Sequence, residues 1–281
     1  MGYRKLFSGS PGARHATIPD FAELTKHKPE KTLLEKIHFR AGRNSAGRIT
    51  VWHKGDRHAR FYRVIDFKRS KIDLVGTVVG IEYDPNRNCR IALVHYTDGS
   101  KGYILAAKDL VTGAKVTSFS GAGEPKIGNA MQLKHIPQGL NLHNVELQPG
   151  RGGQLGRAAG TFVRLMAIDG NFAIIALPSG ELRRVHAECR ATIGEIGMSE
   201  ANVRSIGKAG RNRWMGIRPT VRGNAMNPVA HPLGGGEGHT NGGRQHCTPW
   251  GVVEGTKTRT RKNKNNVFII RRRDGKTLTA E

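Results

Sequence analysis

The positive charge of this chain is concentrated in two segments that flank a nearly neutral middle. Residues 31–70 carry a net charge of +8 and residues 201–281 carry +12, whereas the 130 residues from 71 to 200 carry only +2. Like charges at this density repel one another in a compact body, so they require a polyanion nearby. The middle segment can therefore fold alone, and the two basic segments indicate an anionic partner.

Nucleic acid and an anionic membrane are the two polyanions to consider. No apolar run approaches the roughly 20 residues that a spanning helix needs, and no long basic amphipathic helix occurs. Residues 1–11 lack the apolar stretch of a secretory signal. Three cysteines, far apart and without a Cys-x-x-Cys pair, indicate a reducing compartment. These features favour nucleic acid as the partner and predict no membrane contact.

The middle segment consists of short apolar, β-branched and aromatic runs that end at turn residues. A Thr-Asp-Gly-Ser turn at 97–100, an Asp-Gly turn at 169–170 and a Pro-Ser-Gly turn at 178–180 predict hairpins. The predicted strands span residues 74–83, 91–96, 103–107, 161–167, 172–177 and 181–186.

Short strands with such turns and few helical periods are typical of small antiparallel barrels. Two are predicted, at residues 70–125 and 126–200, joined near residues 121–125. Residues 1–69 then form a basic N-terminal extension, and residues 201–281 form an extended, Gly/Arg-rich basic C-terminal arm. The predicted fold class is mainly β, with two barrels and long extended basic arms.

Residues 207–250 contain abundant Gly, Arg, Asn and Pro with almost no apolar periodicity, so they cannot form a core of their own. Trp214 and Trp250 are unusual in such a segment. Indole and guanidinium planes stack on unpaired bases, and glycines let the backbone approach phosphates closely. The alternative is that these two indoles fold back onto a barrel.

Several blocks of the sequence carry a recognisable pattern. The first is Arg-Asn-Ser-Ala-Gly-Arg-Ile-Thr at 43–50, followed by Tyr-Arg-Val-Ile-Asp-Phe-Lys-Arg at 62–69 and Glu-Tyr-Asp-Pro-Asn-Arg at 82–87. In the same order they resemble the second protein of the large ribosomal subunit, a universal family, in its bacterial or organellar type. The match continues at residues 127–131, 149–155, 157–161, 207–211, 218–223, 225–228, 234–238 and 271–273.

The resemblance implies an OB-fold barrel followed by an SH3-like barrel, in agreement with the two barrels predicted above. It also implies extended arms threaded into 23S-type rRNA near the peptidyl-transferase centre, contact with other large-subunit proteins, and a role in association with the small subunit and in tRNA placement. Two arginines of the family are associated with rRNA binding, and the matching positions are Arg87 and Arg157. Both lie at predicted loop ends, where a guanidinium can bind phosphate in a bidentate manner.

The predicted rRNA-binding residues combine these two arginines with the cations and polar residues of the matched blocks and the basic arms. They are Arg43, Arg48, Lys54, Arg57, Arg60, Arg63, Lys68, Arg69, Arg87, Arg157, Lys208, Arg211, Arg213, Trp214, Arg218, Arg222, Asn227, His231, Arg271, Arg272 and Arg273.

The chain departs from the family pattern in two places. Family members commonly have Asp-His-Pro-His before the triple glycine, whereas residues 230–233 are Ala-His-Pro-Leu. His231 matches the histidine proposed to act in peptide-bond formation, but it lacks the neighbouring acid that would orient the imidazole and raise its basicity. We therefore expect His231 to contact RNA, with acid/base work as the alternative. The tail at 274–281 is more acidic and polar than the family's basic tail.

The sequence contains no recognised motif for self-sufficient catalysis. The nearest string to a P-loop ends in Gly207-Lys208-Ala209, which lacks the hydroxyl for magnesium, and neither Gly-x-Ser-x-Gly nor His-Glu-x-x-His occurs. His231, His239, His246 and Cys247 have the side chains for zinc but no common ligand spacing. The sequence therefore predicts no enzyme, no metal site and no cofactor beyond Mg²⁺ that accompanies rRNA.

Two other classes of function compete with a ribosomal scaffold. One is an extra-ribosomal OB module that binds single-stranded nucleic acid, which would need a compact basic groove with exposed aromatics in the middle segment. The other is an RNA-modifying enzyme, which would need a nucleophile, metal or cofactor pocket. A chain without a presequence favours the cytoplasmic ribosome of a bacterium, or an organellar ribosome with an organelle-encoded protein.

Overall fold

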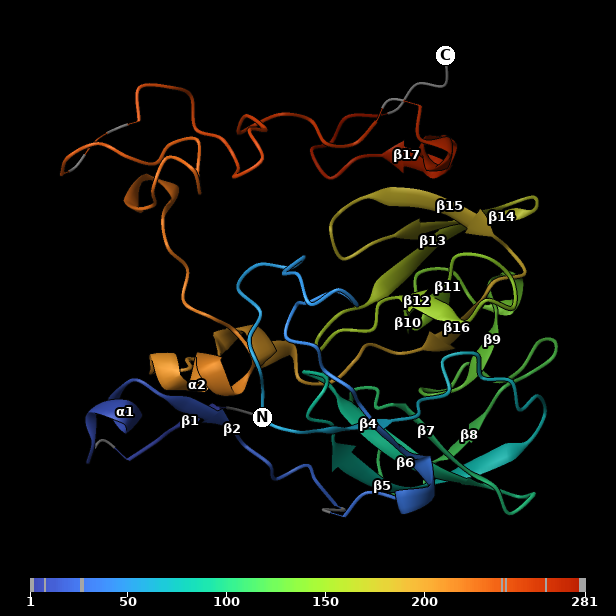
Figure 1. Cartoon of the computed structure of the whole chain (residues 1–281). Coiled ribbons are helices and arrows are strands. Elements are labelled where there is room, and N and C mark those ends of the chain that lie inside the picture. The colour runs from blue at the N-terminus through green and yellow to red at the C-terminus, as the bar shows by residue number, and fades with distance from the viewer. Residues whose placement is uncertain are drawn as a thin grey trace. The chain divides into compact units, whose positions relative to one another are not determined.

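The computed structural model describes residues 3–7, 9–25, 28–238, 240, 242–260 and 262–277. The chain forms two compact units, each assembled from segments far apart in the sequence. The first unit comprises Met1–His38, Ala59–Lys208 and Val267–Glu281, and the second unit comprises Phe39–His58 and Ala209–Asn266. Figure 1 labels their elements. The domain boundaries proposed from the sequence, at 69/70, 125/126 and 200/201, stay predictions.

A four-stranded antiparallel sheet forms the first part of the first unit. Its strand order is β7-β6-β5-β8, with β5 at Val75–Tyr83, β6 at Arg90–Tyr96, β7 at Lys101–Leu105 and β8 at Lys115–Thr117. The three strands predicted for this part are confirmed, with ends shifted by one or two residues. The predicted turn is also present: Asp98 accepts the amide of Ser100 at 2.9 Å, and Gly99 has φ of +79°.

Strand β6 is buried on both faces, which explains its unbroken apolar sequence. Because side chains alternate along a strand, Ala92 and Val94 pack on one face with Ile104. Ile91 and Leu93 pack on the other face with Tyr103, Leu105 and Ile196. Ile196 follows strand β16 (Arg190–Ile193), so this face is covered by chain from the second barrel region.

A seven-stranded sheet completes the first unit, in the order β17-β15-β14-β13-β10-β16-β9, all antiparallel. The predicted strands at 161–167, 172–177 and 181–186 are confirmed, again with small shifts. The strands are β9 Ala130–Gln132, β10 Asn141–His143, β13 Val163–Asp169, β14 Phe172–Ala176, β15 Leu182–His186, β16 Arg190–Ile193 and β17 Ile269–Arg271. Met131, Leu142, Leu165 and Ile175 are fully buried beneath it.

The remaining elements are short. Two-stranded sheets pair β1 with β2, β3 with β4 and β11 with β12. Their bounds are β1 Tyr3–Lys5, β2 Thr17–Pro19, β3 Leu34–Lys36, β4 Phe61–Arg63, β11 Val145–Glu146 and β12 Gly153–Leu155; the helical turns are α1 Pro11–Arg14, η1 Lys31–Leu33, η2 Leu133–His135, η3 Ser199–Val203, α2 Ala209–Trp214, η4 Gly223–Ala225 and η5 Lys264–Phe268.

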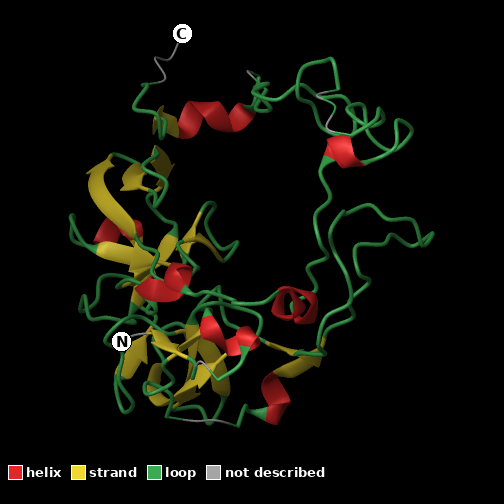
Figure 2. Ribbon diagram, turned by 90° about the vertical axis from the view of Figure 1, so that its left-hand side faces the viewer, coloured by secondary structure: helices red, strands yellow, loops and turns green. Residues whose placement is uncertain are grey.

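The second unit consists mainly of loops, drawn in green in Figure 2. Among its described residues, only Gly216, His231 and Leu233 are buried. The expectation that residues 207–250 have no core of their own is thus confirmed for the residues that the structure places. No helix in the described part of the chain is long and apolar enough to span a bilayer.

His143 is a titratable group inside the seven-stranded sheet. Its side chain is 1% exposed, and its Nδ1 lies 2.9 Å from the carbonyl oxygen of Gly194. Burial lowers the pKa of His143 to about 4, more than the hydrogen bond to Gly194 raises it. The imidazole is therefore neutral in the folded protein near neutral pH, with Nδ1–H donating to Gly194.

This burial predicts acid sensitivity. Between about pH 6.5 and pH 4 the unfolded chain takes up a proton that folded His143 does not, so stability falls as the pH falls. The full effect is about 3 kcal/mol. We expect His143→Gln to reduce the loss of stability between pH 7 and pH 4.5 in urea denaturation, and exposed His38→Gln to leave it unchanged. An unchanged loss in the His143 variant would contradict the assignment.

Candidate RNA interface

A groove of about 870 Å³ lies in the first unit, where loops of both barrel regions meet. It is lined by residues 64–68, 70–71 and 101–103, by Leu33 and Tyr96, and by residues 151–154 with Arg157. We call it the basic groove, because it has five cationic side chains and one acid, Asp66. The cations are Lys68, Lys71, Lys101, Arg151 and Arg157.

Three of these cations have no carboxylate partner among the described residues. Lys71 pairs with Asp98 at 3.1 Å, and Lys101 pairs with Glu30 at 2.9 Å. Lys68, Arg151 and Arg157 are exposed and form no ion pair with any residue that the structure describes. Arg151 and Arg157 only donate to neutral oxygens, those of the Gln148 side chain and the Gly153 carbonyl. Their remaining N–H groups can bind phosphate.

The two arginines singled out by the sequence, Arg87 and Arg157, meet at one aromatic ring. The guanidinium of Arg157 lies 4.6 Å from the ring centroid of Phe67, and that of Arg87 lies 5.4 Å from it. Phe67 itself lines the basic groove. Residues 70 positions apart in sequence are thereby held on one patch, as cation–π contacts orient planar guanidinium groups.

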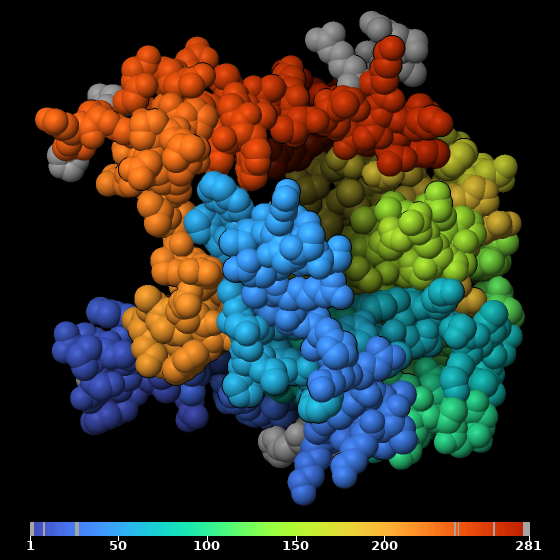
Figure 3. Space-filling view, in the orientation of Figure 1, coloured from blue at the N-terminus to red at the C-terminus, as the bar shows by residue number. Residues whose placement is uncertain are grey.

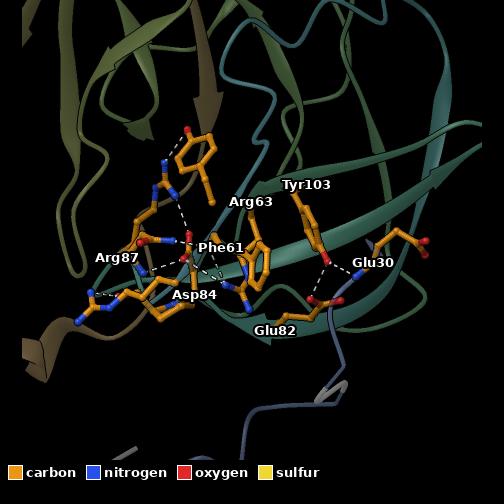
Figure 4. Close-up of polar contacts among 11 residues, drawn as sticks. Glu30, Phe61, Arg63, Glu82, Asp84, Arg87 and Tyr103 are labelled. Carbon is orange, nitrogen blue, oxygen red and sulfur yellow. Dashed lines mark hydrogen bonds and ion pairs between the residues drawn. The ribbon is translucent and has the colours of Figure 1, made fainter. Parts of the chain in front are cut away.

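Asp84, which is fully buried, fixes the orientation of Arg87 (Figure 4). Its carboxylate accepts a hydrogen bond from Arg87 at 2.6 Å and one from the amide of Asn86 at 2.8 Å, and it lies 3.9 Å from Arg63. Arg87 also donates to the hydroxyl of Tyr62 at 3.1 Å. Burial lowers the pKa of Arg87, but the bonds to Asp84 and Tyr62 and the charge of Asp84 outweigh it and raise the pKa overall.

Hydrogen bonds to backbone carbonyls also hold the turn at residues 84–87. Arg60 donates to the carbonyl of Pro85 at 2.6 Å, and the side-chain amide of Asn86 donates to the carbonyl of Phe61 at 2.8 Å. Arg60, Arg63 and Arg87, three predicted RNA contacts, thus also brace the Asp-Pro-Asn-Arg turn. Only part of each guanidinium remains available for phosphate.

A second buried network anchors the chain next to Lys101 (Figure 4). The hydroxyl of Tyr103 donates to Glu82 at 2.7 Å and accepts the amide of Glu30 at 2.8 Å. Burial raises the pKa of Tyr103, and the contacts with Glu82 raise it further, whereas the hydrogen bond from the Glu30 amide opposes them. The hydroxyl therefore stays protonated and keeps Glu30 in position to pair with Lys101.

Glu146 holds the loop that presents Arg151. This carboxylate is 1% exposed and accepts three backbone amides, from Gly150 at 3.2 Å, Gly152 at 2.8 Å and Arg190 at 3.0 Å. Gly150 and Gly152 have φ of +72° and +93°, which side-chain-bearing residues rarely adopt. The Pro-Gly-Arg-Gly-Gly sequence therefore curls around a buried charge and directs Arg151 outward.

Arg69 points into the protein. It is 4% exposed, its Nε donates to Ser118 at 3.2 Å, and its terminal nitrogen donates to the carbonyl of Gly128 at 3.0 Å. Burial lowers the pKa of Arg69 despite the opposing effects of Tyr96 and Asp66. Because Ser118 follows β8 and Gly128 precedes β9, Arg69 joins the two sheets. Its predicted RNA contact stays a prediction, and its visible role is structural.

His231 is also buried, at 7% exposure, inside a loop of the second unit. Its Nδ1 accepts the amide of Leu233 at 3.0 Å, so the neutral ring carries its proton on Nε2. A side chain at Gly223 would overlap the imidazole. The ring thus holds this loop together, which does not test its predicted contact with RNA.

The other predicted contacts lie mostly on the surface. Arg57, Arg60, Arg63, Arg87, Arg211 and Arg272 are partly buried, whereas Arg43, Arg48, Lys54, Lys68, Arg157, Lys208, Arg213, Trp214, Arg218, Arg222, Asn227, Arg271 and Arg273 are exposed.

Three cations of the basic groove, Lys71, Lys101 and Arg151, were not among the residues predicted from the sequence. The supporting carboxylates Asp84 and Glu146 were not predicted either. Arg151 lay within a matched block and could have been included, whereas Lys71 and Lys101 carry no local mark.

No three His, Cys, Asp or Glu side chains of the described residues form a metal-binding group. His239, one of the weighed zinc ligands, lies outside the described residues. The three cysteines are free thiols, and burial raises the pKa of Cys89 to about 11. A thiol in that state is a poor nucleophile near neutral pH.

The buried Asp84 carboxylate yields a stability prediction. Asp84→Asn keeps the shape but removes the charge that Arg87 and Arg63 face, so we expect a loss of about 2 kcal/mol in the free energy of unfolding. Urea denaturation measures the loss. The matched control is Asp109→Asn, because Asp109 is exposed; equal effects at the two positions would contradict the role of Asp84.

Two family models match the chain and together cover most of it. Residues 30–118 match the RNA binding N-terminal domain of Ribosomal Proteins L2, and residues 126–251 match the C-terminal domain of Ribosomal Proteins L2. The first range contains the four-stranded sheet and the second contains β9 to β16, so the predicted OB-fold and SH3-like barrels are confirmed. The chain therefore belongs to the ribosomal protein L2 family, a family of RNA-binding ribosomal proteins.

Proposed function

We propose that this ribosomal, RNA-binding protein binds 23S-type rRNA of the large subunit through the basic groove and the Arg87–Phe67–Arg157 patch. The observation that supports this most is the groove's unpaired charge. Lys68, Arg151 and Arg157 line one concave surface without carboxylate partners in the described structure. Each cation that neutralises a phosphate releases condensed counterions, and this release drives binding.

The shape of the site favours backbone recognition over base readout. RNA helices present phosphates and a wide minor groove, so proteins recognise them largely by shape. Asp84 fixes the turn that carries Arg87, and Glu146 fixes the loop that carries Arg151, so these two arginines are positioned before RNA arrives. Fixed side chains lose less conformational entropy on binding.

Membership of the family supports a more specific role within the ribosome. The chain acts near the peptidyl-transferase centre and supports subunit association, tRNA placement and peptide-bond formation without being a catalyst. It contacts other large-subunit proteins, the small subunit and nearby tRNA, in a bacterial cytoplasmic or an organellar ribosome. Mg²⁺ associated with rRNA is the one cofactor proposed. The buried, hydrogen-bonded imidazole of His231 supports the view that it is no free general base.

The groove predicts a salt-dependent binding defect. We expect Lys68→Ala combined with Arg157→Ala to weaken binding to a large-subunit rRNA fragment, because two phosphate contacts disappear. The slope of log K against log salt should fall by about 2. Lys115→Ala with Lys134→Ala, two exposed lysines outside the groove, removes the same charge and should change the slope less. Equal slopes for both pairs would argue against the groove.

Co-sedimentation separates the ribosomal function from the extra-ribosomal alternative. The protein should remain with large subunits in high-salt sucrose gradients, because an assembled scaffold does not dissociate as a loosely bound module does. Recovery only in the unbound fractions, together with tight binding to any single strand, would favour the alternative.

The parts of the basic arms that form the second unit, residues 39–58 and 209–266, are expected to become ordered on RNA. Few of their described residues are buried, so we expect proteases to cut them in the free protein before the barrels. Added rRNA should protect them, as limited proteolysis with mass spectrometry can show. Arms as resistant as the barrels in the free protein would refute this expectation.

A further inference from the structure

A second cationic pocket, of about 520 Å³, lies wholly within the second unit. Its lining comes from two segments of the chain, between Ala41 and Asp56 and between Arg213 and Pro219. The lining residues include four cations, Arg43, Lys54, Arg213 and Arg218, and a single acid, Asp56. Trp52 and His53 also line it. We call it the Trp52 pocket. Its volume lies in the range of about 300–1,000 Å³ that is typical of sites for small ligands.

A short ladder of backbone hydrogen bonds builds the pocket from two distant segments. Gly55 donates to the carbonyl of Gly216, and Arg218 donates to that of His53, both at 2.9 Å. The ring of His53 lies 3.1 Å from the carbonyl of Pro219. A Cβ at position 55 would lie 2.9 Å from the Cγ of Arg218, so the glycine leaves room for the Arg218 side chain beside these hydrogen bonds.

The two arginines of this pocket are free to bind an anion. The guanidinium groups of Arg213 and Arg218 form no hydrogen bond or ion pair with any part of the chain that the structure describes, and both residues are exposed. Arg43, by contrast, donates to the carbonyl of Gly47 at 2.8 Å. Planar, uncommitted guanidinium groups match the bidentate geometry of phosphate.

An aromatic platform adjoins these cations. The ring centroids of Trp52 and Trp250 are 5.7 Å apart at 50°, and the two residues are 38% and 73% exposed. Trp250 is carried on a small hairpin, in which Thr248 donates to the carbonyl of Val252 and Cys247 pairs with Val253. Figure 3 shows the sky-blue atoms around residue 50 at the surface of the face in view. Exposed indoles beside arginines are typical of stacking sites for unpaired bases.

We propose that the Trp52 pocket binds one unpaired nucleotide of an RNA strand, with its base on the Trp52–Trp250 platform and its phosphate on Arg213 and Arg218. Asp56 supports a whole nucleotide over a bare anion. A carboxylate repels phosphate, but it accepts hydrogen bonds from a ribose hydroxyl or a base N–H group. The inference rests on the proposed function only in that rRNA supplies the strand.

Indole fluorescence of the full-length protein tests this directly. The chain has three tryptophans, so Trp214→Phe leaves Trp52 and Trp250 as the only indoles. In that background we expect single-stranded oligouridylate to quench the fluorescence, and the same strand paired with oligoadenylate to quench it little. Uridine monophosphate should compete better than uridine or inorganic phosphate, because it has both the base and the anion.

Side-chain variants separate stacking from charge. Trp52→Leu keeps an apolar side chain but no π face, so affinity for oligouridylate should fall about tenfold, whereas Trp52→Phe should retain most of it. Arg213→Ala with Arg218→Ala should lower both affinity and its salt dependence. Lys257→Ala with Lys264→Ala removes the same charge from the second unit outside the pocket and should cost less.

Three results would overturn the proposal. They are an unchanged affinity in Trp52→Leu, equal quenching by the duplex, and displacement of the strand by phosphate as effectively as by uridine monophosphate. Trp52→Phe is the control for a folding defect: because it keeps an aromatic ring, it should bind oligouridylate and unfold like the parent protein. Loss of rRNA binding in the Lys68/Arg157 variant tests the basic groove separately, so either site can fail while the other stands.

Discussion

Two carboxylates withdrawn from water, Asp84 and Glu146, determine how the candidate RNA interface presents two of its arginines. Asp84 orients Arg87 on the patch beside the basic groove, and Glu146 holds the loop that carries Arg151 in the groove itself. Each accepts hydrogen bonds from N–H donors: Asp84 from the Arg87 side chain and the Asn86 backbone amide, and Glu146 from backbone amides of the glycine loop. A buried carboxylate is tolerated only when it is paired in this way, so the loops have little freedom to rearrange. The arginines that these loops carry are consequently held in place by acids that never reach the surface.

The two units use cationic side chains in different ways. In the first unit, apolar strands form the core and the cations occupy loop ends, where some are paired and some are left for phosphate. The second unit has almost no core, and its described residues are joined by isolated bridges and hydrogen bonds of turns. The conformation of the second unit therefore depends more on a binding partner than on a hydrophobic core of its own.

Much of the fold was predictable because its determinants are local. Alternation, β-branched runs and Asp-Gly turns specify the hairpins, and the matched blocks specify both barrels. The site was only partly predictable. Arg69 and Arg157 look alike in sequence, but Arg69 faces Ser118 and the Gly128 carbonyl, which no local pattern reveals. Trp52 could not be predicted as a site residue, because its aromatic partner, Trp250, is almost 200 residues away in the sequence.

Strand β17 has a consequence for synthesis. It pairs with β15 at one end of the seven-stranded sheet, although it lies near the C-terminus of the chain. A chain made from its N-terminus exposes the hydrogen-bonding edge of β15 until residues 269–271 emerge, and an open edge favours pairing with other chains. Protection of this edge therefore depends on a strand that is synthesised long after the rest of the sheet.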